Sequence, residues 1–428
     1  MFNLFLFIVF IILNIYLVYG SSRIISLLIG LPINIAGSVY FSQIIFYQDF
    51  VGSNSVIILF LIFSFIFIFF GKKFFFPLLD KYLFNKNKIT LKEIEYISYL
   101  LILGSFLAVF LNYSNLNFFS ETRNYDLSKS GLKHIYTQFL ILPKIASASG
   151  VLLLYFNLKN KKSIKLYLLS FLQILPVIIV TIMFGFRRSE IFHFLSPFFI
   201  YSVLIYAPNI IRNITKNKKR ILSLLFSIFF LSGFAIDYTG PIRKYLFYCG
   251  TEGLCNLDNI RYYYIIDKER YRIPGETINV ERIINRLNTN KIDYDFGTST
   301  LNMLIFRFAP GILIGEDTRQ KVRDNVTNRR GDLVPNTPVS GMGDSILSFG
   351  FFAPLKWLYS TLFFVPFFEL IKKHSYFLLI SLPPISSIIV HMFTHHLDLI
   401  APDLITIFLV FKLINFSLNL FDKEIKKF

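Results

Sequence analysis

Apolar runs of about 20 residues recur along this chain from its beginning almost to its end, and a helix of that length crosses the hydrocarbon core of a bilayer. Hydrophobic residues make up 54% of the 428 residues, and 52 residues are Phe. Such a composition excludes an ordinary soluble globule. The sequence therefore predicts an all-α polytopic membrane protein.

We expect about eleven transmembrane helices, divided by one large polar loop. Residues 1–239 hold about eight of them, residues 240–345 form the loop, and residues 346–428 hold about three. The approximate limits are 2–19, 24–47, 55–70, 94–112, 135–157, 165–185, 190–211, 221–239, 346–370, 376–394 and 397–418.

Lysine and arginine indicate the orientation, because short cytoplasmic loops retain positive charge. The basic loops are 71–93, 159–165 and 212–220, and the loops poorer in basic residues or evenly mixed are those around Asp49, at 113–134 and at 186–189. This alternation predicts a cytoplasmic C-terminus and an outward 240–345 loop. The formal net charge of +18 is then explained by topology and lipid attraction rather than by nucleic-acid binding.

The 240–345 loop is predicted to fold, because tyrosines are spread through it. In residues 276–288 the isoleucines and Leu287 stand at helical spacing behind Thr277 as a cap, which predicts a short amphipathic helix on the membrane. Residues 301–315 are apolar but too short to cross, and Arg307 and Pro310 interrupt them. They predict a re-entrant or interfacial segment.

Two cysteines, Cys249 and Cys255, lie in the same loop. They either pair as a disulfide in an oxidising compartment or remain free thiols at loop positions. In sequence no histidine lies near them to activate a thiolate, so neither alternative makes them catalytic.

Three clusters of charge are candidates for a site. Arg307 is a guanidinium in an apolar segment, which either meets an anion inside the fold or snorkels to headgroups. Arg187, Arg188 and Glu190 in FGFRRSE stand between two apolar helices, either as a phosphate clamp or as a headgroup anchor.

The third cluster precedes and includes a turn rich in proline and glycine, VPNTPVSGMGDS, which leads Asp344 to the mouth of a predicted span. Glycines in such a turn permit close backbone approach to sugar or phosphate oxygens. We expect only one or two of its arginines to be functional, because charge runs are usually solvated. The candidate binding residues here are Arg329, Arg330, Gly341 and Gly343.

With its many spans, one large late outward loop, FGFRRSE in an earlier outward turn and GMGDSILSFGFFAP entering the final helices, the chain resembles Wzy-type O-antigen or oligosaccharide repeat-unit polymerases. The resemblance implies a GT-C-like membrane glycosyltransferase. Its substrates would be undecaprenyl-diphosphate-linked repeat units, joined on the outer face of the bacterial cytoplasmic (inner) membrane without a nucleotide sugar. A chain-length regulator is the further candidate partner. The spacing of Arg330 and Gly341 also matches one found in some members.

This resemblance implies roles for the candidate residues. Arg187, Arg188, Arg307 and Arg330 would stabilise the charge that grows on the departing diphosphate. The acceptor hydroxyl would lose its proton to a carboxylate, and His395 and His396 are the reserve candidates. The carboxylates nearest in sequence to these arginines are Glu316, Asp317 and Asp344. No cofactor is expected, and no spacing typical of a metal site is present.

Three other functions stay open at this point. A ligase would transfer finished polymer from the lipid carrier to another acceptor. A flippase or transporter is disfavoured, because Lys144 and Lys356 are nearly the only basic residues inside apolar runs. A membrane acyltransferase would use His391 as its base.

Overall fold

A computed structural model of the chain describes about half of its residues. These are 90–113, 136, 138–160, 163–183, 190–202, single positions between 241 and 262, 275–309, single positions between 314 and 321, 340–353, 355–356, 375–394, 397 and 400–425. They belong to two compact units. Unit 1 is Met1–Ile94, Ser128–Ile141 and Ile273–Phe428, and unit 2 is Glu95–Leu127 and Leu142–Arg272.

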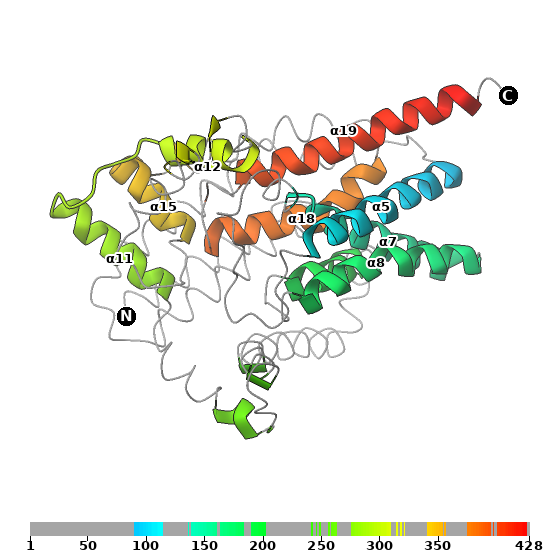
Figure 1. Ribbon diagram of the computed structural model, residues 1–428, viewed down its shortest axis with the longest axis horizontal. Coiled ribbons are helices and arrows are strands. Elements are labelled where there is room, and N and C mark those ends of the chain that lie inside the picture. Colours follow the sequence, from blue (N-terminus) through cyan, green and yellow to red (C-terminus); the bar gives the residue numbers. More distant parts are fainter. Residues whose placement is uncertain are drawn as a thin grey trace, which may run out of the picture. The chain divides into compact units, whose positions relative to one another are not determined.

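Most of the described residues are helical, and no strand occurs among them (Figure 1). Four of their helices are long and apolar enough to cross a membrane: α5 (Leu91–Asn112), α7 (Ile141–Asn160), α8 (Ile164–Met183) and α19 (Ile400–Ile425). They fall on the predicted spans 94–112, 135–157, 165–185 and 397–418. The predicted all-α class with membrane-spanning helices is therefore borne out in this part of the chain, while the number of about eleven spans stays a prediction.

A capping box starts α5. The Thr90 backbone N–H donates to the Glu93 carboxylate at 2.5 Å, and the Glu93 N–H donates to Thr90 Oγ1 at 3.3 Å. This reciprocal pair satisfies two of the free amides that every helix N-terminus leaves. The buried residues of α5 then recur every three or four positions, so one face of the helix meets protein: Ile97, Ser98, Leu101, Ser105, Ala108, Val109 and Asn112.

In unit 2, α7 and α8 form an antiparallel hairpin. Asn157 closes its short connection by donating to the Ser163 carbonyl at 3.0 Å and accepting from the Ser163 N–H at 3.1 Å. Small residues on α7 permit close approach: a Cβ added at Gly150 would stand 2.7 Å from the Ser170 carbonyl oxygen of α8. The two helices therefore pack almost backbone to backbone at this position.

A further helical stretch at 190–202 lies along α7 in the same unit. Lys144 of α7 is hydrogen-bonded to His193, and the Tyr155 hydroxyl donates to the Phe198 carbonyl at 3.3 Å. The contacts advance in the same direction along both helices, so the two run parallel. At the α8 end, the Thr181 hydroxyl donates to the Glu190 carbonyl at 3.5 Å.

These contacts define two opposite ends of the unit 2 bundle. At the Ser163 end, α7 finishes, α8 begins, and Lys165 forms an ion pair with Glu95 of α5 at 2.5 Å. At the Met183 end, α7 begins, α8 finishes and Glu190, the first described residue of the stretch 190–202, meets Thr181 of α8. The chain therefore enters and leaves α8 at opposite ends of the bundle, and the orientation that the charge alternation indicates stays a prediction.

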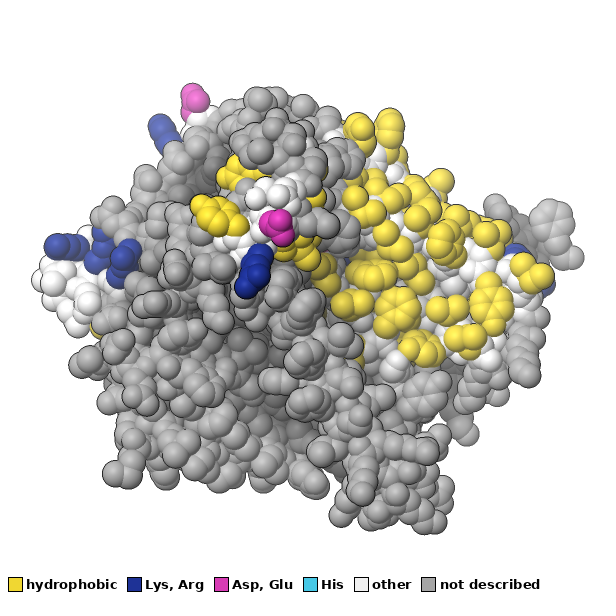
Figure 2. Space-filling view, turned by 90° about the horizontal axis from the view of Figure 1, so that it is seen from below, with side chains coloured by type: hydrophobic (Ala, Val, Ile, Leu, Met, Phe, Trp, Pro, Cys, Tyr) yellow, Lys and Arg dark blue, Asp and Glu magenta, His cyan; other side chains and the backbone are white. Residues whose placement is uncertain are grey.

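Large apolar side chains remain on the outside of these helices. Leu103 and Phe110 of α5 are 72% and 76% exposed, and Leu413 and Phe416 of α19 are each 63% exposed. Figure 2 shows hydrophobic side chains gathered in one broad field, with Lys and Arg side chains outside it or at its edge. A soluble protein rarely carries such a surface, whereas lipid covers it without cost.

Unit 1 is built from α11 (Gly275–Asn288), α12 (Thr298–Phe308), α15 (Ser340–Phe349), α18 (Ser375–Thr394) and α19. Contacts join α15 to α11 and to α18, and join α19 to α12 and to α18 (Figure 1). The predicted helix at 276–288 is thus confirmed as α11. At Ile283, which is 1% exposed, its apolar face meets protein, and its contact with the membrane stays a prediction.

A tight turn before α12 caps the end of α15. The backbone N–H groups of Asp295 and Phe296 donate to the carbonyls of Leu347 and Ser348 at 3.3 and 3.0 Å. These carbonyls belong to the last turn of α15, where no N–H group of the same helix is left to bond them. The turn therefore fastens the start of α12 to the end of α15, although about 50 residues of sequence separate them.

Gly350 is required where α15 ends. Its φ is +55°, and an added Cβ would stand 2.6 to 2.8 Å from the ring and hydroxyl of Tyr294. We expect Gly350→Ala to destabilise the protein by about 1–3 kcal/mol through strain and overpacking. The double variant Gly350→Ala with Tyr294→Ala should recover the steric part of this loss. Equal melting temperatures for wild type and Gly350→Ala in detergent would contradict the expectation.

The structure corrects two details of the prediction. Thr277 lies inside α11, which begins at Gly275, so it is not the cap. The span predicted at 346–370 does not begin as one continuous helix, because α15 begins at Ser340 and ends at Phe349, followed by a 3₁₀ turn, η3 (Gly350–Phe352). The positive φ of Gly350 produces this break. The spans predicted within 1–89 and at 221–239 lie outside the described residues.

Candidate functional site

The segment GMGDSILSF forms most of α15 in unit 1, where it is deeply buried. Side-chain hydroxyls on this helix bond back one turn, because Ser345 Oγ donates to the Gly341 carbonyl and Ser348 Oγ donates to the Asp344 carbonyl. Asp344, Ser345 and Ser348 are all 0% exposed. A carboxylate so far from water needs compensating partners.

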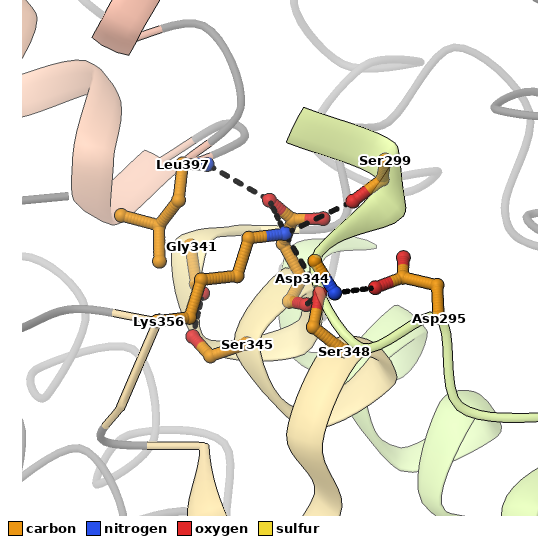
Figure 3. Close-up of polar contacts among 9 residues, drawn as sticks. Asp295, Ser299, Gly341, Asp344, Ser345, Ser348, Lys356 and Leu397 are labelled. Carbon is orange, nitrogen blue, oxygen red and sulfur yellow. Dashed lines mark hydrogen bonds and ion pairs between the residues drawn. The ribbon is translucent and has the colours of Figure 1, made fainter. Parts of the chain in front are cut away.

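Lys356 provides the opposite charge (Figure 3). Its Nζ lies 3.2 Å from Asp344 Oδ2, and both side chains are 0% exposed. The same ammonium group donates to Ser348 Oγ at 2.8 Å and to Ser299 Oγ of α12 at 3.2 Å. An ammonium has three N–H donors, so each of them has a partner in this cluster.

Asp344 also reaches a segment far along the chain. Its Oδ2 accepts a hydrogen bond from the backbone N–H of Leu397 at 3.0 Å (Figure 3). Leu397 follows directly after the predicted reserve residues His395 and His396. The Asp344–Lys356 cluster, consisting of Ser299, Asp344, Ser348, Lys356 and the Leu397 amide, therefore joins α12, α15 and the segment three residues before α19.

The buried ion pair is expected to fix the arrangement of the segments more than to raise the free energy of unfolding. Taking two charges out of water costs several kcal/mol for each ion, and their attraction offsets this cost only when the hydrogen bonds around them are complete. Removing one partner leaves the other charge buried and uncompensated. The cluster should therefore hold its three segments in one arrangement.

A second buried carboxylate lies beside the cluster, in the turn before α12. Asp295 is 3% exposed, and its Oδ1 accepts from the Gly297 N–H at 2.8 Å (Figure 3). This bond holds the turn in which Gly297 has a φ of +85°. Asp295 therefore fixes the direction in which α12 departs, and with it the place of Ser299.

Four further site residues that were predicted from the sequence are described in unit 1, and their environments differ. Arg307 lies in the last turn of α12 and is half-buried, Asp317 is exposed, and Gly341 and Gly343 are buried in the first turns of α15. The Asp317 carboxylate is therefore accessible from solvent. Asp344 is instead bonded to Lys356 and to the Leu397 amide.

Glu190 is the described member of the FGFRRSE cluster, and it belongs to unit 2. It is 2% exposed and lies within the helical stretch 190–202, one turn before His193. The predicted site residues that lie outside the described part of the chain are Arg187, Arg188, Glu316, Arg329, Arg330, His395 and His396. His391 is helical within α18, and its side-chain environment is not described.

Sequence reasoning did not assign Lys356, Ser299 or His193 to a site. Lys356 does carry a signal, since a lysine inside an apolar run needs an anionic partner and Asp344 is only three helical turns away in sequence. Ser299 and His193 carry none, because their partners are distant in sequence. The contacts appear only when the helices are assembled.

Cys249 is disulfide-bonded, which decides between the two alternatives for the two cysteines of the chain. Within the described ranges, no group of three or more His, Cys, Asp or Glu side chains is placed to hold a metal ion.

No family model, curated protein or solved structure matches this chain.

Proposed function

We propose that this protein is a membrane glycosyltransferase that polymerises undecaprenyl-diphosphate-linked oligosaccharide repeat units on the outer face of the bacterial cytoplasmic membrane. The observation that carries the proposal is the buried Asp344–Lys356 ion pair within the GMGDSILSFGFFAP segment. A charged cluster is expensive among apolar helices, and such clusters in membrane proteins usually serve function.

The proposed reaction is a displacement at the anomeric carbon of one repeat unit. The hydroxyl of the acceptor sugar forms the new glycosidic bond, and the bond from the anomeric carbon to the diphosphate oxygen breaks. The bonding electron pair goes to the departing lipid diphosphate, whose growing negative charge guanidinium groups stabilise. The hydroxyl proton goes to a carboxylate.

The environments of the described residues refine these roles. Arg307 is half-buried at the end of α12, the helix that Ser299 ties to Lys356. It is therefore a candidate for the diphosphate, alongside Arg187, Arg188 and Arg330. Asp317 is exposed and is, with Glu316, the better candidate for accepting the proton. Asp344 is then a positioning residue, because its carboxylate bonds Lys356 and the Leu397 amide and so fixes their places.

Deleting the gene in its bacterium tests the function directly. We expect surface polysaccharide to change from a ladder of chain lengths to a single repeat unit, and the wild-type gene should restore the ladder. The readout is the size distribution of the polysaccharide on a gel. Loss of every exported unit would indicate a flippase instead, and intact but unattached chains would indicate a ligase.

Complementing the deletion with arginine variants tests the site. Arg307→Ala should leave only the single repeat unit while the protein stays in the membrane, because a fixed donor to the leaving group is worth about 10²–10³-fold in rate. The matched control is Arg261→Ala, an exposed arginine of the same predicted loop, which should restore the full ladder. Normal chain lengths with Arg307→Ala would remove Arg307 from the mechanism.

A further inference from the structure

Exposed aromatic side chains gather in unit 1 where α15 ends, outside the four described helices that are long enough to cross a membrane. The ring centroids of Tyr294 and Phe296 are 6.1 Å apart. The Tyr294 ring also lies against Gly350, where an added Cβ would stand 2.6 Å from it. Gly350 begins η3, which ends at Phe352. Two segments distant in sequence therefore present one aromatic patch, consisting of Tyr294, Phe296 and Phe352.

The backbone at Phe296 is held against its own preference. Its φ is +49°, a left-handed conformation that is uncommon for a bulky side chain. The bond from its N–H to the Ser348 carbonyl at 3.0 Å fixes it there. The ring gains little from packing against protein, because it is 71% exposed. Neither backbone preference nor core packing explains a phenylalanine at this position, so its ring is suited to an external contact.

The amphipathic helix that precedes this turn uses its own apolar face inside the protein. Ile283 of α11 is 1% exposed, and α11 packs against α15. The residues from Asn288 to Lys291, where α11 ends, are exposed and polar. Exposed aromatic surface at this end of unit 1 is therefore provided by the turn that follows α11 and by η3.

The aromatic patch lies close to a membrane-crossing helix of the same unit. The turn leads directly into α12, which packs against α19, and the apolar crossing segment of α19 is Ala401–Leu420. From α15, which ends beside Tyr294, Asp344 bonds the Leu397 amide three residues before α19. The N-terminal end of such a helix marks a boundary of the bilayer, and tyrosine is enriched at that depth. The patch is therefore placed to meet lipid.

We propose that the aromatic patch inserts into the bilayer leaflet at the N-terminal end of α19 and anchors the turn between α11 and α12 to the membrane. The rings of Phe296 and Phe352 enter the acyl-chain region, while the Tyr294 hydroxyl stays among the headgroups. The partner is the phospholipid surface, because the patch adjoins a membrane-crossing helix and contains no charged side chain. Removal of these rings from water drives the contact. This anchor goes beyond the proposed polymerase activity and does not depend on it.

Spin labelling of the full-length protein in phosphatidylethanolamine–phosphatidylglycerol vesicles tests the contact. Phe296→Cys and Phe352→Cys each introduce one reactive thiol, because native Cys249 is disulfide-bonded. Oxygen concentrates among acyl chains and a nickel chelate stays in water, so the ratio of their collision rates with the label reports its depth. Both labels should give a higher ratio of oxygen to nickel collisions than a label at Asn288→Cys, an exposed polar position at the end of α11.

A second reference and two contrary outcomes complete the test. A label at Leu413→Cys, an exposed position within α19, gives the ratio expected in lipid, and the Phe296 and Phe352 labels should approach it. Ratios equal to the Asn288 value would overturn the proposal. So would labels that meet water in vesicles and are shielded from both reagents in native membranes, because that result indicates a protein partner.

Phe296→Asn separates the ring from the backbone that carries it. Asparagine adopts a positive φ readily, so this variant should keep the turn and the wild-type melting temperature in detergent. Combined with a label at Phe352→Cys, it should move the ratio at that label toward the Asn288 value, since one anchor is lost. An unchanged ratio would overturn the anchoring role of the Phe296 ring.

Discussion

Replacing Lys356 by Met is expected to lower the free energy of unfolding by about 3–5 kcal/mol, because it leaves the carboxylate of Asp344 buried without its counter-charge. Asp344 and Lys356 are both 0% exposed, so water cannot take over the lost interaction without opening the fold. The measurement is denaturation of the purified protein in mixed micelles, followed by circular dichroism.

A matched lysine controls for the substitution itself. Lys291, in the turn after α11, is exposed and lies outside the membrane-crossing helices. Lys291→Met should change the unfolding free energy by no more than about 0.5 kcal/mol, because an exposed charge in contact with water keeps its hydration. Losses of similar size at Lys356 and Lys291 would contradict the buried ion pair.

The partner residue supplies a second control. Asp344→Asn combined with Lys356→Gln removes both charges and keeps groups able to hydrogen-bond to each other and to the Leu397 amide. We expect this double variant to be more stable than either single variant by about 1 kcal/mol or more, since directly paired residues are not additive. Strictly additive losses would show that the pair is not coupled.

Replacing Gly150 by Ala is expected to separate α7 from α8 and to destabilise the protein by about 1–3 kcal/mol, with a larger loss for Gly150→Leu. The new Cβ would meet the Ser170 carbonyl oxygen at 2.7 Å, Gln173 Cβ at 2.9 Å and Ile174 Cγ1 at 3.1 Å. The first of these is backbone, which cannot rotate away. Thermal unfolding of the purified protein in detergent measures the effect.

Gly104 of α5 offers a control with the same chemistry. A Cβ there would lie 3.5 Å from Leu142 Cδ1, which is ordinary contact. Gly104→Ala should therefore be neutral or should stabilise the protein by up to about 1 kcal/mol, because alanine is the better helix former. If Gly150→Ala were tolerated as well as Gly104→Ala, the close packing of α7 on α8 would be wrong.

Much of the helical framework could be predicted from sequence. The apolar runs at 94–112 and 165–185 correspond to α5 and α8 within a few residues, because a helix in lipid must be apolar over the full thickness of the bilayer. The amphipathic spacing of Ile283 and Leu287 likewise indicated α11. Prediction failed at Gly350, where a positive φ ends α15 inside an apolar run that by itself predicts one continuous helix.

The candidate site could be predicted only in part. Asp344 was identifiable, since a carboxylate at the mouth of an apolar span is unusual. The rest of the cluster was not, because Leu397, whose amide bonds Asp344, and Ser299, which bonds Lys356, lie 53 and 45 residues from Asp344 along the chain. Lys144 was visible as a lysine in an apolar run, but its bond to His193 crosses 49 residues.

The sequence by itself determined that this chain is an all-α protein with membrane-spanning helices, because hydrocarbon thickness dictates the length and composition of each helix without reference to its neighbours. Only the tertiary structure decided which polar groups inside those helices meet. A buried charge must find its partners wherever packing puts them. Lys356 therefore draws Asp344, Ser348 and the distant Ser299 into one cluster, and Lys144 finds His193.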